Sequence, residues 1–166
     1  MLQNLPADQA IVRRRVGATE WIVFNRPTSR NALTHDMEST LTAAFESLSQ
    51  DPGVRAVVLT GAPGSKPAFV AGQDMGDLGG AASVDSSMAL EASSEAMLSA
   101  LERLRAPTVC AMAGACVGVG ALMAAACDIR IAAPSLRFGF PIARTVGNCL
   151  SIVNYARLVD LIGPAR

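Results

Sequence analysis

The pattern of hydrophobic and polar positions predicts strands and helices that alternate along the chain. Two short runs rich in β-forming residues lie on either side of Gly17 and Ala18, which predicts a hairpin. The run over 54–60 is almost continuously apolar, as expected for a strand covered on both faces. The expected strands are 11–16, 21–24, 54–60, 108–113, 129–132 and a short extended piece at 137–140; the expected helices are 35–49, 84–104, a short buried helix ending near Cys127, and 150–162. This alternation predicts an α/β fold.

The helix expected over 35–49 has the clearest pattern. Its apolar residues recur at the spacing of one helical face: Met37, Leu41, Ala44, Phe45 and Leu48. Asp36 and Glu38 fall in the first turn, where the helix dipole stabilises acidic side chains. We therefore expect the apolar face of this helix to lie in the core.

An uncharged segment at 106–127 offers an alternative, because it is long enough to cross a bilayer. Pro107 opens the segment, and Gly114, Gly118 and Gly120 interrupt it. The residues between are mostly Ala and Cys rather than Leu and Ile, so insertion into a membrane would be weak. We favour a buried strand, a glycine turn and a buried helix over a transmembrane helix.

Length and composition indicate one globular domain. The 166 residues are enough for a domain with its own core, and we treat 1–166 as a single domain. Lys and Arg total 14 and Asp and Glu total 14, so we expect no basic surface to attract nucleic acid or an anionic membrane. Hydrophobic residues make up 51% of the chain and charged residues 17%, which excludes a disordered protein.

The four cysteines form no CxxC pair, which argues against a zinc site or a disulfide framework. Buried free thiols in a reducing cytoplasm are the better interpretation. The N-terminal residues contain no apolar stretch of the kind found in secretory signals. We therefore expect a cytoplasmic protein.

Two glycine-containing segments, 69–75 and 114–120, are expected to expose backbone N–H groups. The first follows a strand and lies in a long loop rich in Gly and Pro expected over 61–80, and the second lies where a strand turns into a helix. Glycine lets a ligand approach the backbone closely. Two N–H donors aimed at one point make an oxyanion hole, which stabilises negative charge on a carbonyl oxygen. The alternative is that both are ordinary glycine turns in an alanine-rich core. Dinucleotide binding is disfavoured, because these glycines do not form GxGxxG.

Four groups of residues occur in one order along the chain: NRP at 25–27 with NAL at 31–33, RAVVLTG at 55–61 with FVAGQDM at 69–75, AGACVGVG at 113–120 with ACDIR at 126–130, and RFGFP at 137–141. Together they resemble the crotonase, or enoyl-CoA hydratase/isomerase, superfamily. The resemblance covers essentially the whole chain. It implies a ββα spiral and an acyl-CoA thioester as substrate.

The resemblance also implies particular roles. The backbone N–H groups of Gln73 and Val119 would form the oxyanion hole, with Gly118 as the neighbouring alternative to Val119. The other residues that the resemblance assigns to acyl-CoA binding are Arg26, Arg30, Ala71, Gly72 and Asp74, with the adenine near Ala71 and the pyrophosphate near the loop after Pro27. Coenzyme A is then part of the substrate, and we expect no separate cofactor and no metal.

The sequence departs from the family at the acid/base positions. Hydratases of the family use two glutamates, and the matching positions here are Leu122 and Ile142. Each positioned acid or base typically contributes 10²–10⁴-fold, so efficient addition of water is disfavoured. Asp77 and Arg144 are candidate replacements, although surface solvation is the plainer interpretation of both. The alternative function is an acyl-CoA-binding or assembly protein that kept the fold without the chemistry.

The chain ends at Arg166, where family members continue into a C-terminal helical segment. In the family that segment closes the acyl-CoA site and supports trimers. We therefore expect a truncated spiral domain, and a homo-oligomer, a trimer or a dimer of trimers, only if that segment exists.

Overall fold

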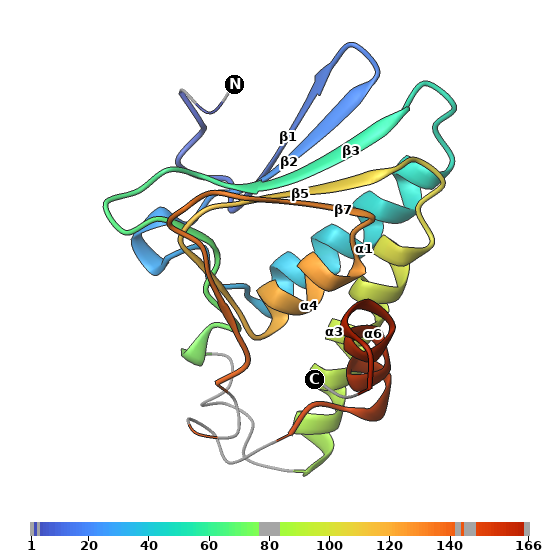
Figure 1. Ribbon diagram of the computed structural model, residues 1–166. Coiled ribbons are helices and arrows are strands. Elements are labelled where there is room, and N and C mark those ends of the chain that lie inside the picture. Colours follow the sequence, from blue (N-terminus) through green and yellow to red (C-terminus); the bar gives the residue numbers. More distant parts are fainter. Residues whose placement is uncertain (1, 3, 77–83, 142–143, 145–148, 165–166) are drawn as a thin grey trace.

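The computed structural model describes residues 2, 4–76, 84–141, 144 and 149–164 (Figure 1). The strands are β1 (Ile11–Val16), β2 (Thr19–Phe24), β3 (Ala56–Gly61), β4 (Ala68–Val70), β5 (Thr108–Met112), β6 (Ala115–Val117), β7 (Ile129–Ala132) and β8 (Arg137–Gly139). The helices are the 3-10 helix η1 (Pro27–Ser29), α1 (His35–Ser49), α3 (Val84–Glu102), α4 (Val119–Ala126) and α6 (Ile152–Ile162). Strands and helices alternate, so the predicted α/β class is confirmed.

The larger sheet has the strand order β1-β2-β3-β5-β7. The hairpin β1–β2 is antiparallel, and the remaining pairs are parallel. Helices α1, α3 and α4 cover one face of this sheet (Figure 1). Their apolar sides and the inward residues of the strands form one core, in which Ile22, Leu59 and Cys110 are fully buried.

The smaller sheet consists of β4, β6 and β8, all parallel. Sequence patterns placed residues 68–70 in a long loop and 115–117 in a turn, and both assignments were wrong. Each segment is only three residues long and lies among glycines and prolines, so neither shows strand periodicity. Because parallel strands end at the same edge of a sheet, the segments that follow β4, β6 and β8 are brought together.

The amphipathic pattern of α1 is confirmed: Met37, Leu41, Ala44, Phe45 and Leu48 are all buried. Thr34 caps the helix, since its side chain accepts a hydrogen bond from the N–H of Met37 at 3.3 Å. This cap fixes the point where the loop over 25–33 turns into α1.

The uncharged segment 106–127 is divided into β5, β6 and the eight-residue α4. In the part of the chain that the structure describes, no helix has the length and hydropathy needed to span a membrane. Cys110, Cys116 and Cys127 are buried free thiols, as predicted, but Cys149 is exposed, so the prediction of burial was wrong for that residue. Burial raises the pKa of Cys116 to about 12, which keeps this thiol protonated and unreactive.

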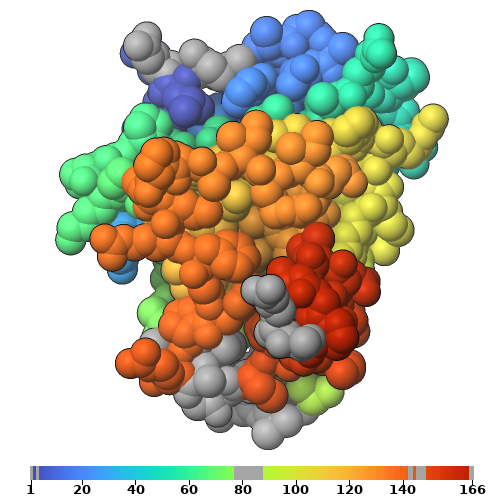
Figure 2. Space-filling model, viewed as in Figure 1, coloured from blue at the N-terminus to red at the C-terminus, as the bar shows by residue number. Residues whose placement is uncertain are grey.

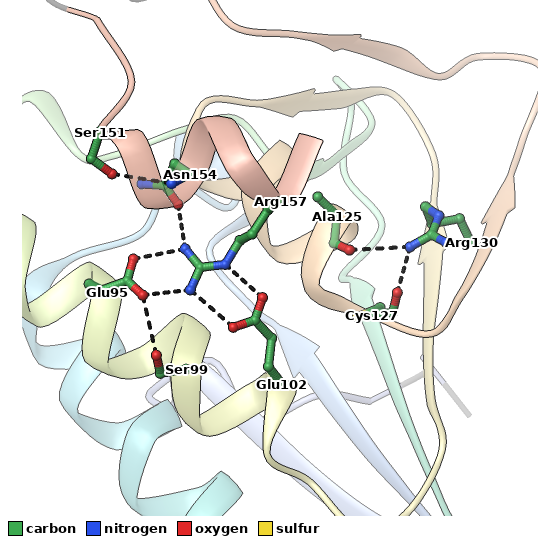
Figure 3. Close-up of polar contacts among 9 residues, drawn as sticks. All are labelled: Glu95, Ser99, Glu102, Ala125, Cys127, Arg130, Ser151, Asn154 and Arg157. Carbon is green, nitrogen blue, oxygen red and sulfur yellow. Dashed lines mark hydrogen bonds and ion pairs between the residues drawn. The ribbon is translucent and has the colours of Figure 1, made fainter. Parts of the chain in front are cut away.

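Helix α6 is held against α3 by Arg157 (Figure 3). The guanidinium pairs with Glu95 at 2.5 Å and with Glu102 at 2.6 Å, and also donates to Asn154. The side chain of Arg157 is 8% exposed, whereas those of Glu95 and Glu102 are 31% and 36% exposed, so water reaches the carboxylate side of these ion pairs. The surface formed by β7, β8 and α6 is apolar in part, with Ile131, Phe138 and Ile152 exposed, and Figure 2 shows it in orange and red.

Candidate functional site

The segments that follow β4 and β6 meet at two glycines. A Cβ built on Gly118 would lie 3.8 Å from the Cα of Gly72, and one built on Gly72 would lie 3.6 Å from the carbonyl oxygen of Val117. Both glycines have positive φ, 106° and 56° for Gly72 and Gly118, which other residues rarely adopt. The two glycine segments predicted from the sequence are therefore side by side.

The backbone N–H of Gln73 points away from Leu33, the residue that pairs with it. Leu33 pairs with Gln73 as an isolated parallel bridge. The N–H of Leu33 donates to Gly72 at 2.9 Å, and its carbonyl accepts from Asp74 at 2.8 Å. In such a bridge Gln73, the residue between the two that bond Leu33, directs its own N–H to the side away from Leu33. Among the described residues, the N–H of Gln73 has no acceptor.

The backbone N–H of Val119 is available for a different reason. Val119 is the first residue of α4, and the first N–H groups of a helix have no partner inside it. The preceding N–H, of Gly118, donates to the carbonyl of Gly139 in β8 at 3.0 Å. The N–H of Gly118 is thereby hydrogen-bonded, whereas the N–H of Val119 has no acceptor in the described part of the chain. The helix dipole adds partial positive charge at this end.

Asn31 ties the loop over 25–33 to the strand that leads to Gly72. Its side-chain amide donates to the carbonyls of Ala68 at 2.8 Å and Ala62 at 3.3 Å. Its Oδ1 accepts from the N–H of Arg26 at 2.9 Å. The side chain is 1% exposed, and the backbone has φ 55°. Asn31 was part of the resemblance, but its positioning role could not be predicted from sequence.

We expect Asn31→Ala to destabilise the protein by about 2–4 kcal/mol, because three backbone groups lose their partner in a buried position. Thermal or urea unfolding measures this loss. Arg30→Ala is the matched control, since Arg30 has φ 53° but an exposed side chain, and it reports the cost of alanine at a left-handed position. Equal destabilisation by the two substitutions would contradict the role given to Asn31.

Arg26 and Asp74 form an ion pair directly beside Gln73. Nη1 of Arg26 lies 2.8 Å from Oδ2 of Asp74 and also donates to the carbonyl of Ala32 at 2.7 Å. The other carboxylate oxygen of Asp74 accepts from the N–H of Gly76 at 2.9 Å. The bond from Gly76 and the guanidinium of Arg26 lower the pKa of Asp74 below its usual value.

This lowered pKa predicts a pH dependence of stability. The folded protein holds Asp74 ionised more strongly than the unfolded chain does, so the contribution is full above about pH 4 and is lost as pH falls through the lowered pKa. We expect Asp74→Asn to cost about 1 kcal/mol at neutral pH and progressively less in acid. Unfolding free energies from pH 3 to pH 7 test this, and a difference that stays constant with pH would contradict it.

Comparison with known proteins places these observations in a family. The family model for enoyl-CoA hydratase/isomerase matches residues 17–166. The chain belongs to the enoyl-CoA hydratase/isomerase family. It is 34% identical over 153 residues to a probable enoyl-CoA hydratase of Mycobacterium bovis, covering 92% of this chain and 56% of that protein. It is 30% identical over 176 residues to the peroxisomal Delta(3,5)-Delta(2,4)-dienoyl-CoA isomerase of Arabidopsis thaliana, covering 94% and 62%.

The fold agrees with this membership. An enoyl-CoA hydratase/carnithine racemase from Magnetospirillum magneticum superposes with a TM-score of 0.88 at 33% identity, covering 95% of this chain and 58% of that one. The predicted crotonase-like spiral is confirmed. The chain spans little more than half the length of the relatives described here.

The positions that the resemblance matches to the two glutamates of hydratases lie partly outside the described residues. Leu122, which resemblance aligns with the first family glutamate, is 6% exposed and packs in the core. Ile142 and Asp77 lie outside the described residues. Arg144 is exposed, and its backbone N–H donates to the carbonyl of Pro141 at 2.8 Å. The structure thus brings together Gln73, Val119, Gly72, Gly118, Arg26 and Asp74, and it leaves the side chain of Arg30 at the surface.

Asp128 has a structural role, as its position at the start of a strand predicts. Its carboxylate accepts from both the N–H and the hydroxyl of Thr108 at 2.7 Å. These bonds join the first residue of β5 to the chain entering β7, and they lower the pKa of Asp128. The carboxylate of Asp128 therefore stabilises the sheet.

Proposed function

We propose that this protein binds an acyl-CoA thioester and polarises its carbonyl with the backbone N–H groups of Gln73 and Val119. One observation carries the proposal: Gly118 lies so near Gly72 that a Cβ added to it would be 3.8 Å from the Cα of Gly72, and the N–H that follows each glycine has no acceptor in the described part of the chain. Family membership supports the substrate class, since its members are named for enoyl-CoA chemistry.

The chemistry of such a site is stabilisation of an enolate. When a base removes a proton from the carbon next to the thioester, the electron pair of the broken C–H bond moves to the thioester oxygen. Two N–H donors at that oxygen hold the negative charge, and each contributes roughly 3–4 kcal/mol to the transition state. The dipole of α4 acts in the same direction.

The side chains around the hole favour enolate chemistry over the addition of water. Leu122 supplies no proton acceptor where resemblance places the first glutamate of hydratases. Asp74 is engaged by Arg26 and Gly76, so it stays ionised as part of the loop rather than acting as a proton donor. Asp77 and Arg144 remain our candidates for a replacement side chain. Arg30, at the surface of the loop after Pro27, together with Arg26 and Ala71, remains our proposed contact for coenzyme A.

The alternative is an acyl-CoA-binding or assembly protein without catalysis. It is favoured by the aliphatic Leu122 and Ile142 at the acid/base positions. Cytoplasmic location, and a trimer or dimer of trimers where a C-terminal segment is present, also remain predictions. Both alternatives require the thioester to bind, so binding alone does not separate them.

Mass spectrometry of butyryl-CoA in heavy water separates them. We expect protein-dependent uptake of deuterium at the carbon next to the thioester, above the rate in buffer alone. A protein that binds butyryl-CoA but produces no uptake would be a binding protein. A protein that does not bind it would contradict the proposal itself.

A further inference from the structure

Two buried side-chain atoms among the described residues have no hydrogen-bond partner: Oε2 of Glu38 and Nε2 of Gln73. A buried polar atom without a partner is costly, so each calls for an explanation. For Glu38 the neighbouring residues supply that explanation. Its other oxygen accepts from the hydroxyl of Ser94, and Oε2 lies 3.7 Å from Nδ1 of His35, within ion-pair distance. Gln73 has no comparable neighbour in the described part of the chain.

The side chain of Gln73 lies beside the proposed oxyanion hole. Paired residues of two neighbouring strands place their side chains on the same side, so the carboxamide extends on the side of Leu33, which is fully buried. The carboxylate of the next residue, Asp74, accepts from Arg26 and Gly76. The orphaned N–H of the carboxamide thus belongs to the same residue whose backbone N–H has no acceptor in the described part of the chain.

We propose that Nε2 of Gln73 donates a hydrogen bond to an oxygen on the acyl group of the bound thioester. The site then prefers acyl groups that carry a carbonyl or hydroxyl oxygen close to the thioester over plain hydrocarbon acyl groups. This inference rests on the proposed function, because the same residue must hold the thioester oxygen through its backbone. The side chain of Gln73 is attached to the Cα that is bonded to this backbone nitrogen. Its carboxamide can therefore reach an oxygen on the acyl carbons next to the thioester. A buried donor rejects a ligand that offers no acceptor.

Calorimetric titration of three thioesters tests the inference. Acetoacetyl-CoA and 3-hydroxybutyryl-CoA carry an oxygen on the third carbon, and butyryl-CoA does not. We expect the unaltered protein to bind the first two about three- to tenfold more tightly, as one neutral hydrogen bond provides. Gln73→Leu keeps the backbone N–H and removes the carboxamide. We expect this variant to lose the preference for the two oxygenated thioesters over butyryl-CoA.

Val119→Pro provides the second comparison, since it removes a backbone donor and leaves the carboxamide in place. We expect it to keep the preference for oxygenated acyl groups while weakening polarisation of the thioester. Thermal unfolding of each variant verifies that it is folded. Equal binding of all three thioesters by the unaltered protein, or an unchanged preference in Gln73→Leu, would overturn the inference while leaving the proposed function intact. Failure to bind butyryl-CoA would overturn the proposed function, and the inference with it.

Discussion

Val119→Pro should lower the rate of deuterium uptake next to the thioester by about 10²–10³-fold, the effect of removing one donor from an oxyanion hole. Proline has no N–H, so the substitution deletes the donor itself. Val119 is the first residue of α4, where proline fits the backbone and no helical hydrogen bond is lost. Gly118 before it adopts backbone conformations closed to other residues, which eases the restriction that proline imposes on its predecessor.

Val119→Ala is the matched control. It shortens the same side chain but retains the N–H, so we expect its uptake rate to stay close to that of the unaltered protein. Thermal unfolding of both variants separates a lost donor from a lost fold. If proline and alanine slowed uptake equally, the backbone of Val119 would not be part of the hole.

Gly114→Ala should destabilise the protein by roughly 3–5 kcal/mol and lower the melting temperature by about 10 °C. A Cβ at this position would lie 1.8 Å from the carbonyl oxygen of Pro67, and φ is 65°. The backbone must therefore move at the point where the N–H of Ala115 donates to that same carbonyl at 3.1 Å. Because this contact starts the pairing of β4 with β6, the shift should also separate Gly72 from Gly118.

Gly139→Ala offers the matched comparison within the same small sheet. A Cβ on Gly139 would meet nothing within 4 Å. Calorimetric melting should show a change of well under 1 kcal/mol for this variant. Similar losses at positions 114 and 139 would contradict the close approach of β4 and β6.

The two glycine segments were predictable because a backbone position with positive φ usually requires glycine, and glycines can be seen in the sequence. Gly72 and Gly118 stand where a strand meets a turn, and both were identified as places that expose the backbone. Long helices with a regular apolar pattern were also predictable, and α1 has the bounds and buried face that its pattern indicates. Short strands were not, because three residues such as those of β4 carry no measurable alternation.

Which backbone N–H groups have acceptors depends on pairing between distant segments. The N–H of Gln73 is directed outward only because Leu33, far away in the chain, bonds the residues on either side of it. Likewise, Asn31 appears in the sequence as one polar residue in a loop, although it bonds backbone groups at Ala62 and Ala68. Such long-range pairing leaves no periodic signal.

The central claim is that two backbone donors polarise a bound thioester, and the absorbance of 4-dimethylaminocinnamoyl-CoA tests it most directly. The electron-donating ring makes the absorption move to longer wavelength when the thioester carbonyl gains negative charge. We predict a red shift on binding to the unaltered protein and to Val119→Ala, and a much smaller shift on binding to Val119→Pro. A bound ligand whose spectrum does not shift, or shifts equally in Val119→Pro, would contradict the claim.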